Sequence, residues 1–382
     1  MMIIHVWCMK LKDDFFQKKL YQIQEYLHAE ELDVLLLFNP ANIAYATGFF
    51  HLQTERPLAG AIPSEGSPLL LIPLLEIDRV PDYAEVEFYF DYPGKVSRIE
   101  WVKSQLERRS LTTVGVENSI SLSSYEVLSD LNVYRTSVIS DMRQIKNPEE
   151  IALISKAAEY ADYAVERAVY HTKEGITEFE INERTRMDVS ERMLEELEEI
   201  VPVQGGLSGG LVCSGENGAL PHALPSSKKV KKGESIILSF GAAVGGYHAE
   251  SERTAFVGSP SEKQKDAFEV MAEAQRTGGE AVKDGEKCCD VNEVCLNVIR
   301  EKGYEKYLRH RMGHGIGLQG HEPPWIEEGD ETVLKSGMTI SNEPGVYMPG
   351  FGGFRHSDTV LVTKEGGTSL TKYPKGLDSL II

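Results

Sequence analysis

The sequence predicts an α+β protein of two domains, an α/β domain over residues 1–142 and a larger, duplicated domain over residues 143–382. Three observations predict this class. The length of 382 residues suits two domains. Strand-like and helix-like runs alternate in the first part, as in a mixed sheet covered by helices. In the second part, a pattern of residues recurs later in the same domain.

The first domain begins with a helix-like segment. Residues 14–31 carry apolar side chains three to four positions apart, from Phe16 to Leu27, which predicts an amphipathic helix. Residues 96–108 show a second helix-like pattern. Apolar runs typical of buried strands lie at residues 33–39, 68–74 and 114–119. This alternation predicts a mixed sheet with covering helices.

The second domain is predicted to begin near Arg143 with a long helix. Asn147 is a good N-cap residue, and Pro148 suits the first helical turn. Glu149 and Glu150 follow, and their negative charge is favourable at the positive end of a helix. These residues place a helix start just after the domain boundary.

An internal repeat runs through the second domain. The pattern Lys-Glu-Gly, five residues, then Ile-Asn-Glu at 173–183 matches Lys-Asp-Gly, five residues, then Val-Asn-Glu at 283–293. A glycine six positions before Ser239 is likewise matched by one six positions before Glu343. A duplicated helix–helix–hairpin unit would close two curved sheets over one cleft, with helices outside. Ligand sites form preferentially in such clefts.

A pair of strands between Gly233 and Val257 carries the most informative polar pattern. Because side chains on a strand alternate between faces, His248, Glu250 and Glu252 share one face. If this face is buried, each charge needs a partner, a metal or a proton. If it is exposed, water solvates it. The pattern alone leaves both interpretations open.

Further motifs downstream favour a buried functional face. They are His222 in LPHALP, His314 in GHGIG followed by His321, Glu343 in SNEPG, and the closing GGFRHSDTVLV. With these motifs in this order, the sequence resembles the creatinase, aminopeptidase P, prolidase and methionine aminopeptidase group from about Leu32 to the C-terminus. The resemblance implies a creatinase-like N-terminal domain followed by a pseudo-two-fold "pita-bread" catalytic domain.

The resemblance also implies a metal site that this sequence has lost in part. In the metallopeptidase members, two aspartates, one histidine and two glutamates hold two divalent ions. The matching positions here are Ser239, Glu250, His314, Glu343 and Ser357. Hydroxyl groups do not neutralise divalent ions as carboxylates do, so we expect no metal cofactor. The alternative is one divalent ion (Mn, Co or Zn) on Glu250, His314 and Glu343, with Glu252 as an optional fourth ligand.

Creatinase, a member that works without metal, implies catalytic roles for His222, Glu252, His314 and Glu343. His222 would be the general base that takes a proton from water and returns it to the leaving nitrogen, since the pKa of histidine lies near neutral pH. Glu252 and Glu343 would bind a cationic or N–H part of the substrate. The alternative for His222 is an ordinary loop histidine.

Three more residues are predicted to contact substrate: Arg56, His321 and Arg355. In creatinase, an arginine at the spacing of Arg56 from Gly48 binds a substrate carboxylate and comes from the partner subunit. This implies a homodimer whose active site lies near the partner's N-terminal domain. A surface arginine is the alternative for Arg56, and an ion-pair partner is the alternative for Arg355.

Two other patterns concern neighbours of these residues. His356 and Asp358 alternate with Ser357 and should face the opposite side of their strand, so neither replaces the missing glutamate. The run GLSGG around Ser208 is predicted to be a flexible loop and does not match the GxSxG nucleophile turn.

Composition excludes several classes of partner. The formal net charge of −19 argues against nucleic acid and anionic membranes, which require basic surfaces. The apolar start of the chain is too short for a membrane anchor and lacks a signal-peptide cleavage site, so we expect a cytoplasmic protein. The odd number of cysteines without a CxxC pattern predicts reduced thiols at Cys8, Cys213, Cys288, Cys289 and Cys295.

The sequence therefore predicts a cytoplasmic, dimeric creatinase/prolidase-like hydrolase. It would cleave an amide, amidine or peptide C–N bond of a small polar substrate by histidine-assisted attack of water, with little or no metal. One alternative is a metal-dependent Xaa-Pro dipeptidase or aminopeptidase, which the general motif set favours. Another is a non-catalytic binding protein derived from a peptidase. The joint presence of a general base and three partner residues argues against the last, because binding alone requires no base.

Overall fold

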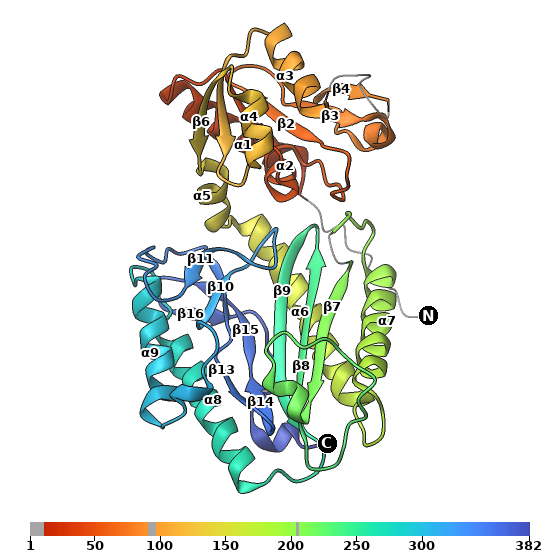
Figure 1. Ribbon diagram of the computed structural model, residues 1–382, viewed down its shortest axis with the longest axis vertical. Helices are drawn as coiled ribbons and strands as arrows, with labels where there is room; N and C mark the ends of the chain where they lie inside the picture. Colours follow the sequence, from red (N-terminus) through yellow and green to blue (C-terminus); the bar gives the residue numbers. More distant parts are fainter. Residues whose placement is uncertain (1–10, 91–96, 204–205) are drawn as a thin grey trace. The chain divides into compact units, whose positions relative to one another are not determined.

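The computed structural model describes residues 11–90, 97–203 and 206–382, and these residues form two compact units (Figure 1). One unit spans residues 11–143 with a short segment that begins at Val201, and the other contains the rest. Cys8, the apolar N-terminal stretch and Val96 lie outside the described residues.

The N-terminal unit is built on a mixed sheet with the strand order β4-β3-β2-β1-β5-β6. Strand β1 pairs antiparallel with β2 and parallel with β5, which confirms the predicted mixed sheet. All side chains of β1 are buried in the core. The strands are β1 (Val34–Leu37), β2 (Ala59–Pro63), β3 (Leu69–Pro73), β4 (Glu85–Tyr89), β5 (Thr113–Glu117) and β6 (Asn132–Thr136).

Three helices of this unit, α2, α3 and α4, begin at side-chain N-caps, and α1 buries an apolar face. Ile23 and Leu27 on α1 are fully buried, as their spacing predicted. Ser97 forms a capping box with Glu100 at the start of α3. The helices are α1 (Asp13–Ala29), α2 (Pro40–Thr47), α3 (Arg98–Arg108), α4 (Leu122–Leu128) and α5 (Val138–Gln144), with a 3₁₀ turn η1 (Leu74–Arg79).

Two helix pairs of the second unit confirm the internal repeat. They are α6 (Pro148–His171) with α7 (Glu178–Glu196), and α8 (Glu262–Ala281) with α9 (Cys288–Glu301). Asn147 caps α6 with Glu150 in a capping box, as predicted. The repeated glycines lie between the members of each pair, Gly175 with φ 85° and Gly285 with φ 98°. Glycine adopts these left-handed conformations without steric cost, which explains why it recurs.

The strands of the second unit form one sheet with the order β11-β10-β12-β15-β9-β8-β7, to which β16 adds beside β15, and a separate β13-β14 hairpin. The strands are β7 (Ser208–Ser214), β8 (Ser235–Val244), β9 (Tyr247–Phe256), β10 (Gly313–Gly315), β11 (Glu322–Ile326), β12 (Thr339–Asn342), β13 (Gly345–Met348), β14 (Gly352–Arg355), β15 (Ser357–Val362) and β16 (Gly367–Ser369). The 3₁₀ turns are η2 (Gly215–Ala219), η3 (Glu305–Tyr307) and η4 (Leu377–Leu380).

The two halves of the repeat share a continuous sheet, whereas the sequence suggested two curved sheets. Strand β9 from the first half pairs antiparallel with β15 from the second half, with Glu252 opposite Ser357. Helix α6 packs on β8 and β9, while α8 and α9 lie beside strands of the second half (Figure 1). This pairing brings the polar residues of both halves to one place.

One loop prediction is wrong. The run GLSGG belongs in part to β7, which pairs antiparallel with β8 over its whole length from Ser208. Glycine is needed at position 210 for packing, because a Cβ there would lie 2.3 Å from the ring of Phe240. Glycine here permits close strand packing rather than flexibility.

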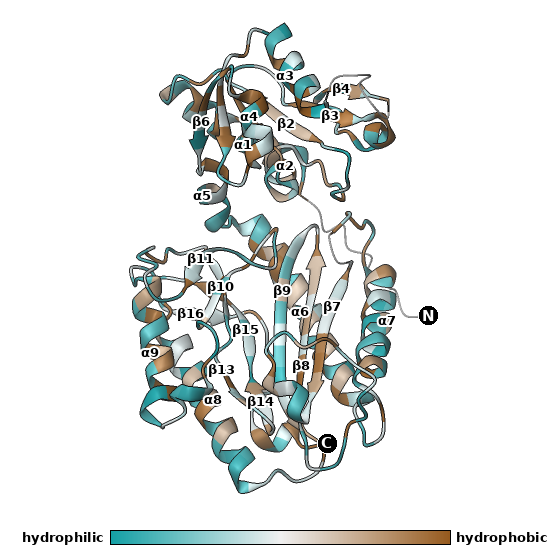
Figure 2. Cartoon of the chain, in the orientation of Figure 1, coloured by the Kyte–Doolittle hydropathy of each residue, from teal (hydrophilic) through white to brown (hydrophobic). Residues whose placement is uncertain are grey.

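Strands β8 and β9 differ sharply in side-chain character (Figure 2). Strand β8 is mostly apolar, whereas β9 carries Glu250, Glu252 and Arg253 in the middle of the sheet. Glu252 and Arg253 are buried. Buried charges require partners, so β9 marks the place where a site is built. Within the described part of the chain, no helix has both the length and the apolar character needed to span a bilayer.

Candidate active site

A cavity of about 470 Å³ in the second unit gathers predicted site residues from both halves. These residues come from β8, β9, β10, β14 and the loops beside them. The predicted residues in its lining are His222, Ser239, Glu250, Glu252, His314, His321, Glu343 and Arg355. Motifs that are far apart in the sequence therefore meet in one cavity.

Strand alternation places two carboxylates in this cavity. Glu250 and Glu252 are two positions apart on β9 and both line it. His248, predicted on the same face, is outside the lining, and its backbone N–H donates to the carbonyl of Gly317 at 2.7 Å. The predicted shared face is therefore correct for the two glutamates, but the cavity does not extend along the strand as far as His248.

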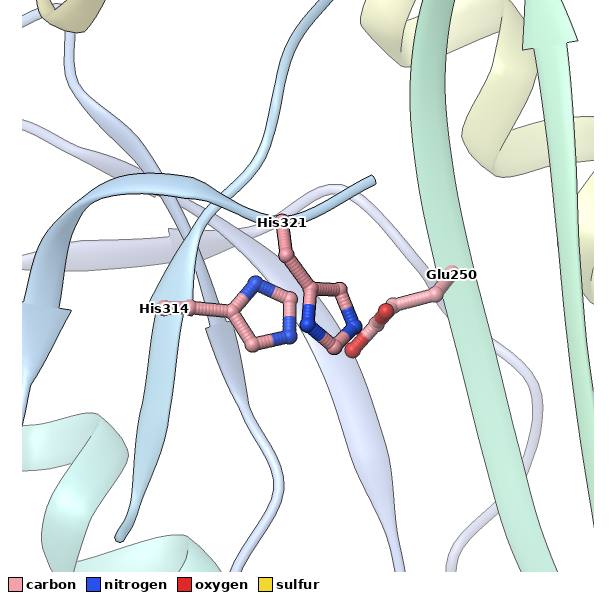
Figure 3. A group of neighbouring side chains, drawn as sticks. All are labelled: Glu250, His314 and His321. Carbon is pink, nitrogen blue, oxygen red and sulfur yellow. The ribbon is translucent and has the colours of Figure 1, made fainter. Parts of the chain in front are cut away.

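Glu250, His314 and His321 converge from three segments (Figure 3). One ligand atom of each lies within 4.8 Å of the others. The two imidazole rings stack with centroids 3.8 Å apart and an angle of 25°. A Cβ on Gly313 would lie 2.1 Å from the carbonyl oxygen of Ser341, so glycine is required for β10 to approach β12 and place the neighbouring histidine.

His314 is the most buried member, at 1% exposure. Its Nε2 lies 3.0 Å from Oε1 of Glu343, yet this nitrogen has no well-aligned hydrogen-bond partner among the described residues. Burial alone would lower the pKa of His314, but the negative charges of Glu343 and Glu250 outweigh burial and raise it to about 9. A buried imidazole beside two carboxylates is an arrangement in which a bound cation could take the place of the proton.

The two carboxylates beside His314 have opposite pKa shifts. Burial, reinforced by repulsion from Glu343, raises the pKa of Glu250. Burial also opposes ionisation of Glu343, but the positive charge and hydrogen bonding of His314, with Arg355 nearby, lower its pKa. In proteins, two acidic groups with such divergent environments are typical of functional sites.

A second charged group occupies the cavity wall. Arg355 bonds both carboxylate oxygens of Glu252, with Nη2 3.0 Å from Oε1. Nη1 donates to the hydroxyl of Tyr347 at 3.0 Å and to the carbonyl of Pro221 at 3.2 Å. Ser239 also donates its hydroxyl to Glu252. Of the two roles considered for Arg355, the structure contains the ion pair.

This arrangement does not fit two metal ions. Ser239 bonds Glu252, and the hydroxyl of Ser357 donates to Oε1 of Glu250 at 2.8 Å. The guanidinium of Arg355 already neutralises Glu252. Two serines and an internal cation therefore stand where a second ion would need anionic ligands.

One divalent ion fits the remaining ligands. Ligand atoms of Glu250, His314 and His321 all lie within 4.8 Å of one another, and Glu343 lies beside His314. The expectation that no metal binds is therefore not supported, and the single-ion alternative suits the geometry better. His321 had been assigned to substrate contact. The sequence does contain a signal for this role: His321 follows the glycine-rich run around His314 and directly precedes β11, which pairs with β10.

The other predicted residues lie in different surroundings. His222 is exposed on the loop after η2 and lines the cavity. Arg56 belongs to the N-terminal unit, where its Nη1 lies 2.8 Å from Glu55, and it is not in the lining of this cavity. Sequence reasoning missed His310, whose Nε2 lies 2.7 Å from the hydroxyl of Tyr347 and which also lines the cavity.

The chain matches two known domain families. Residues 152–364 match metallopeptidase family M24, and residues 19–145 match the creatinase/prolidase N-terminal domain. A Xaa-Pro dipeptidase of Pyrococcus horikoshii is 32% identical over 95% of this chain and 99% of its own. One from Pyrococcus furiosus is 32% identical over 94% of this chain and 99% of its own.

Solved structures show the same architecture. The prolidase of Pyrococcus horikoshii superposes with a TM-score of 0.82 at 32% identity, covering 94% of this chain and 99% of that one. A Xaa-Pro dipeptidase of Bacillus anthracis gives a TM-score of 0.81 at 28% identity, covering 95% and 99%. Both proteins are similar to this chain over both of its units.

Proposed function

The chain belongs to metallopeptidase family M24, and from this premise we propose that it hydrolyses the C–N bond of small peptides with one divalent ion as cofactor. The observation that carries the proposal is the convergence of Glu250, His314 and His321 in the lining of the cavity, with Glu343 beside His314. The relatives named as Xaa-Pro dipeptidases favour dipeptides of that kind as substrates. The metal-dependent peptidase, an alternative in the sequence analysis, is thus better supported than the metal-free one.

The residues of the chain divide into three roles in this mechanism. Glu250, His314, His321 and Glu343 would hold the ion, which when bound supplies a Lewis acid and lowers the pKa of water. His222, exposed at the cavity, takes a proton from the attacking water. The water oxygen bonds to the carbonyl carbon, the C–N bond breaks, and the imidazolium returns its proton to the leaving nitrogen.

The Arg355–Glu252 pair provides a fixed charge distribution around the reacting bond. Both oxygens of Glu252 are engaged, so this carboxylate is held rigidly at 4% exposure. Hydrogen-bond donors that are fixed before the reaction stabilise developing charge without reorganisation. We therefore assign Arg355 and Glu252 to substrate orientation.

A second candidate is metal-free hydrolysis of a small amide or amidine. The observation that favours it is the guanidinium of Arg355, a permanent cation where the two serines have removed metal ligands. Arg355 would then supply the positive charge that an ion supplies in the first candidate. A non-catalytic binding protein is disfavoured, because the general base and its partner residues line one cavity.

Hydrolysis of Xaa-Pro dipeptides tests the proposal. We expect turnover that disappears after chelation and returns with manganese, and a loss of at least about 100-fold in kcat when His222 is replaced by Ala. The matched control is His28→Ala, which removes an exposed histidine at the end of α1. Activity that survives chelation would support the metal-free candidate. Full activity of His222→Ala would contradict both.

The resemblance adds two proposals on assembly and location. We infer a homodimer in which Arg56 acts near the partner subunit's cavity, and a cytoplasmic location. The net charge of −19 is consistent with the absence of nucleic-acid and membrane partners. Light scattering of the purified protein tests the dimer directly.

A further inference from the structure

A separate cavity of about 660 Å³ lies in the second unit. Helix α8, the strands β12, β15 and β16 and the C-terminal segment supply its walls. Among the described residues, its lining has no member in common with the lining of the active-site cavity. A volume of this size suits a small organic ligand, and the proposed reaction gives this cavity no role.

Strand β15 separates this cavity from the active site. Asp358 lines the separate cavity, whereas Ser357, the residue before it, donates its hydroxyl to Glu250 in the active site. Neighbouring positions on a strand point to opposite faces of the sheet. The separate cavity therefore opens on the other face of β15 and is a distinct place for a ligand to bind.

The amide of Asn342 leaves one acceptor in the lining of this cavity without a donor. Asn342 is 3% exposed, and its Nδ2 donates to the carbonyl of Gln275 at 2.8 Å. Because that carbonyl only accepts, it fixes the orientation of the amide. Oδ1 is then a buried acceptor with no hydrogen-bond partner among the described residues. A buried acceptor without a donor costs free energy, so a ligand that offers an N–H group would be stabilised here.

The other buried polar groups of the lining have partners. Asp358 accepts from Arg253 at 2.9 Å and from Nζ of Lys375 at 2.7 Å. Nδ1 of His356 accepts from the backbone N–H of Thr254 at 3.2 Å. Lys375 is itself in the lining, so the chain already places one ammonium group in this cavity. The surroundings therefore stabilise an ammonium group, and Oδ1 of Asn342 is the acceptor left for a second one.

Exposed carboxylates at the cavity favour a positively charged ligand. Glu280 is paired with Arg276 at 2.9 Å. Glu269 and Glu365 are exposed and have no ion pair within the described ranges of the chain. A cation near them gains favourable electrostatic energy, whereas an anion is repelled. The apolar part of the lining is Phe268, Ala272, Val360 and Leu377.

We propose that this cavity binds a small aliphatic amine in its charged form. One N–H group of the amine donates to Oδ1 of Asn342, its hydrocarbon part contacts the apolar residues, and the carboxylates of Glu269 and Glu365 attract its charge. The site is independent of the proposed peptidase reaction, because its residues take no part in that reaction.

Calorimetric titration of the purified full-length protein tests the proposal. The probes are 1,4-diaminobutane, which is charged at neutral pH, and 1,4-butanediol, a neutral compound of similar length. We expect the diamine to bind, and the diol to bind at least about 10-fold more weakly, since charge-assisted hydrogen bonds are the stronger ones. Equal binding of the two probes, or no binding of the diamine, would overturn the proposal.

Substitutions at the cavity locate the binding site. Glu269→Gln and Glu365→Gln should each weaken diamine binding about 3-fold, as expected for exposed charges. Asn342→Ala should weaken it about 10-fold, through the lost hydrogen bond to a charged group. The matched control is Glu262→Gln, which removes a carboxylate of the same helix that is 85% exposed and outside the lining. The two variants of exposed residues decide the test even if Asn342→Ala fails to fold, and affinities equal to that of the control would contradict the proposal.

The active-site cavity also contains carboxylates, so one more variant separates the two places. Glu343→Gln removes a carboxylate of the active-site cavity that is not in the lining of the separate cavity. We expect it to leave diamine binding within about twofold of the wild type. Loss of binding in Glu343→Gln, with binding retained in Glu269→Gln and Glu365→Gln, would place the diamine in the active site and overturn the proposal.

Discussion

Two arginine–carboxylate pairs share the middle of β9, which supplies Glu252 to one and Arg253 to the other, and they differ in what surrounds them. Arg253 pairs with Asp358 at 2.9 Å, and Arg355 pairs with Glu252. Neighbouring positions on a strand point to opposite faces, so residues 252 and 253 contribute to different pairs. The Arg253–Asp358 pair, called the enclosed pair below, is almost fully buried, with Asp358 beside a different pocket, and the Arg355–Glu252 pair lines the cavity of the candidate active site.

The charged groups of the enclosed pair are extensively hydrogen-bonded, as expected of a structural ion pair. Arg253 is 0% exposed and donates to the carbonyls of Glu252, Ser357 and Tyr373 as well as to Asp358. Asp358 accepts further bonds from Gln275, Thr371 and Lys375. Charges buried without water are tolerated when their hydrogen-bonding groups are satisfied in this way.

The cavity pair is also hydrogen-bonded, but it faces space that a substrate can enter. The comparison shows that burial and pairing alone do not separate a structural ion pair from a functional one. The neighbouring residues do so: Asp358 lines a different pocket, whereas the Arg355–Glu252 pair shares its cavity with His222 and His314.

Breaking the enclosed pair should have the largest effect on stability. Asp358→Asn leaves Arg253 buried without its counter-charge, so we expect the free energy of unfolding to fall by about 3–5 kcal/mol. Denaturant unfolding measures this. The control is Glu280→Ala, which breaks an ion pair with Arg276 whose side chains are 61% and 64% exposed and should cost less than about 1 kcal/mol. Similar losses of unfolding free energy in Asp358→Asn and Glu280→Ala would show that the buried pair stabilises the protein no more than an exposed one.

Breaking the cavity pair should act mainly on catalysis. Glu252→Gln keeps the size of the side chain but removes its charge, so we expect kcat/KM to fall by about 100-fold. We expect the accompanying loss in unfolding free energy to be about 1–2 kcal/mol, smaller than for the enclosed pair. Steady-state kinetics and denaturant unfolding of the same preparation test both parts. Unchanged activity would show that Glu252 is structural.

Acid should reduce the stabilisation that the enclosed pair provides, by less than the substitutions described above. Burial opposes ionisation of Asp358, but Arg253 and Lys375 outweigh it and lower its pKa. A lowered folded-state pKa means that the stabilisation is present above the unfolded value of about 4 and is lost as pH falls through the folded value. The difference in melting temperature between wild type and Asp358→Asn should therefore shrink as the pH is lowered from 7 below about 4. A constant difference would contradict this assignment.

The local features of the fold could be predicted from sequence because their causes are local. The cap at Asn147, the apolar face of α1 and the shared face of Glu250 and Glu252 each follow from residues a few positions apart. The predicted face change between Ser357 and Asp358 is also confirmed, because one bonds Glu250 and the other Arg253.

Features that depend on contacts between distant segments could not be predicted. The pairing of Arg355 with Glu252 brings the end of β14, in a separate hairpin, against β9, and no periodicity encodes this contact. The place of His321 beside His314 follows from the pairing of β10 with β11. The strand formed by GLSGG depends on the ring of Phe240 above it. In each case tertiary packing, and not local propensity, decides the structure.

Metal content of the purified protein tests the central claim most directly, because the claim is that Ser239 and Ser357 reduce a two-ion site to one ion. We would combine inductively coupled plasma mass spectrometry with calorimetric titration of manganese into chelator-treated protein, using wild type and His314→Ala. The account predicts about one ion per chain, lost in the variant. Two tightly bound ions per chain, or none, would contradict it.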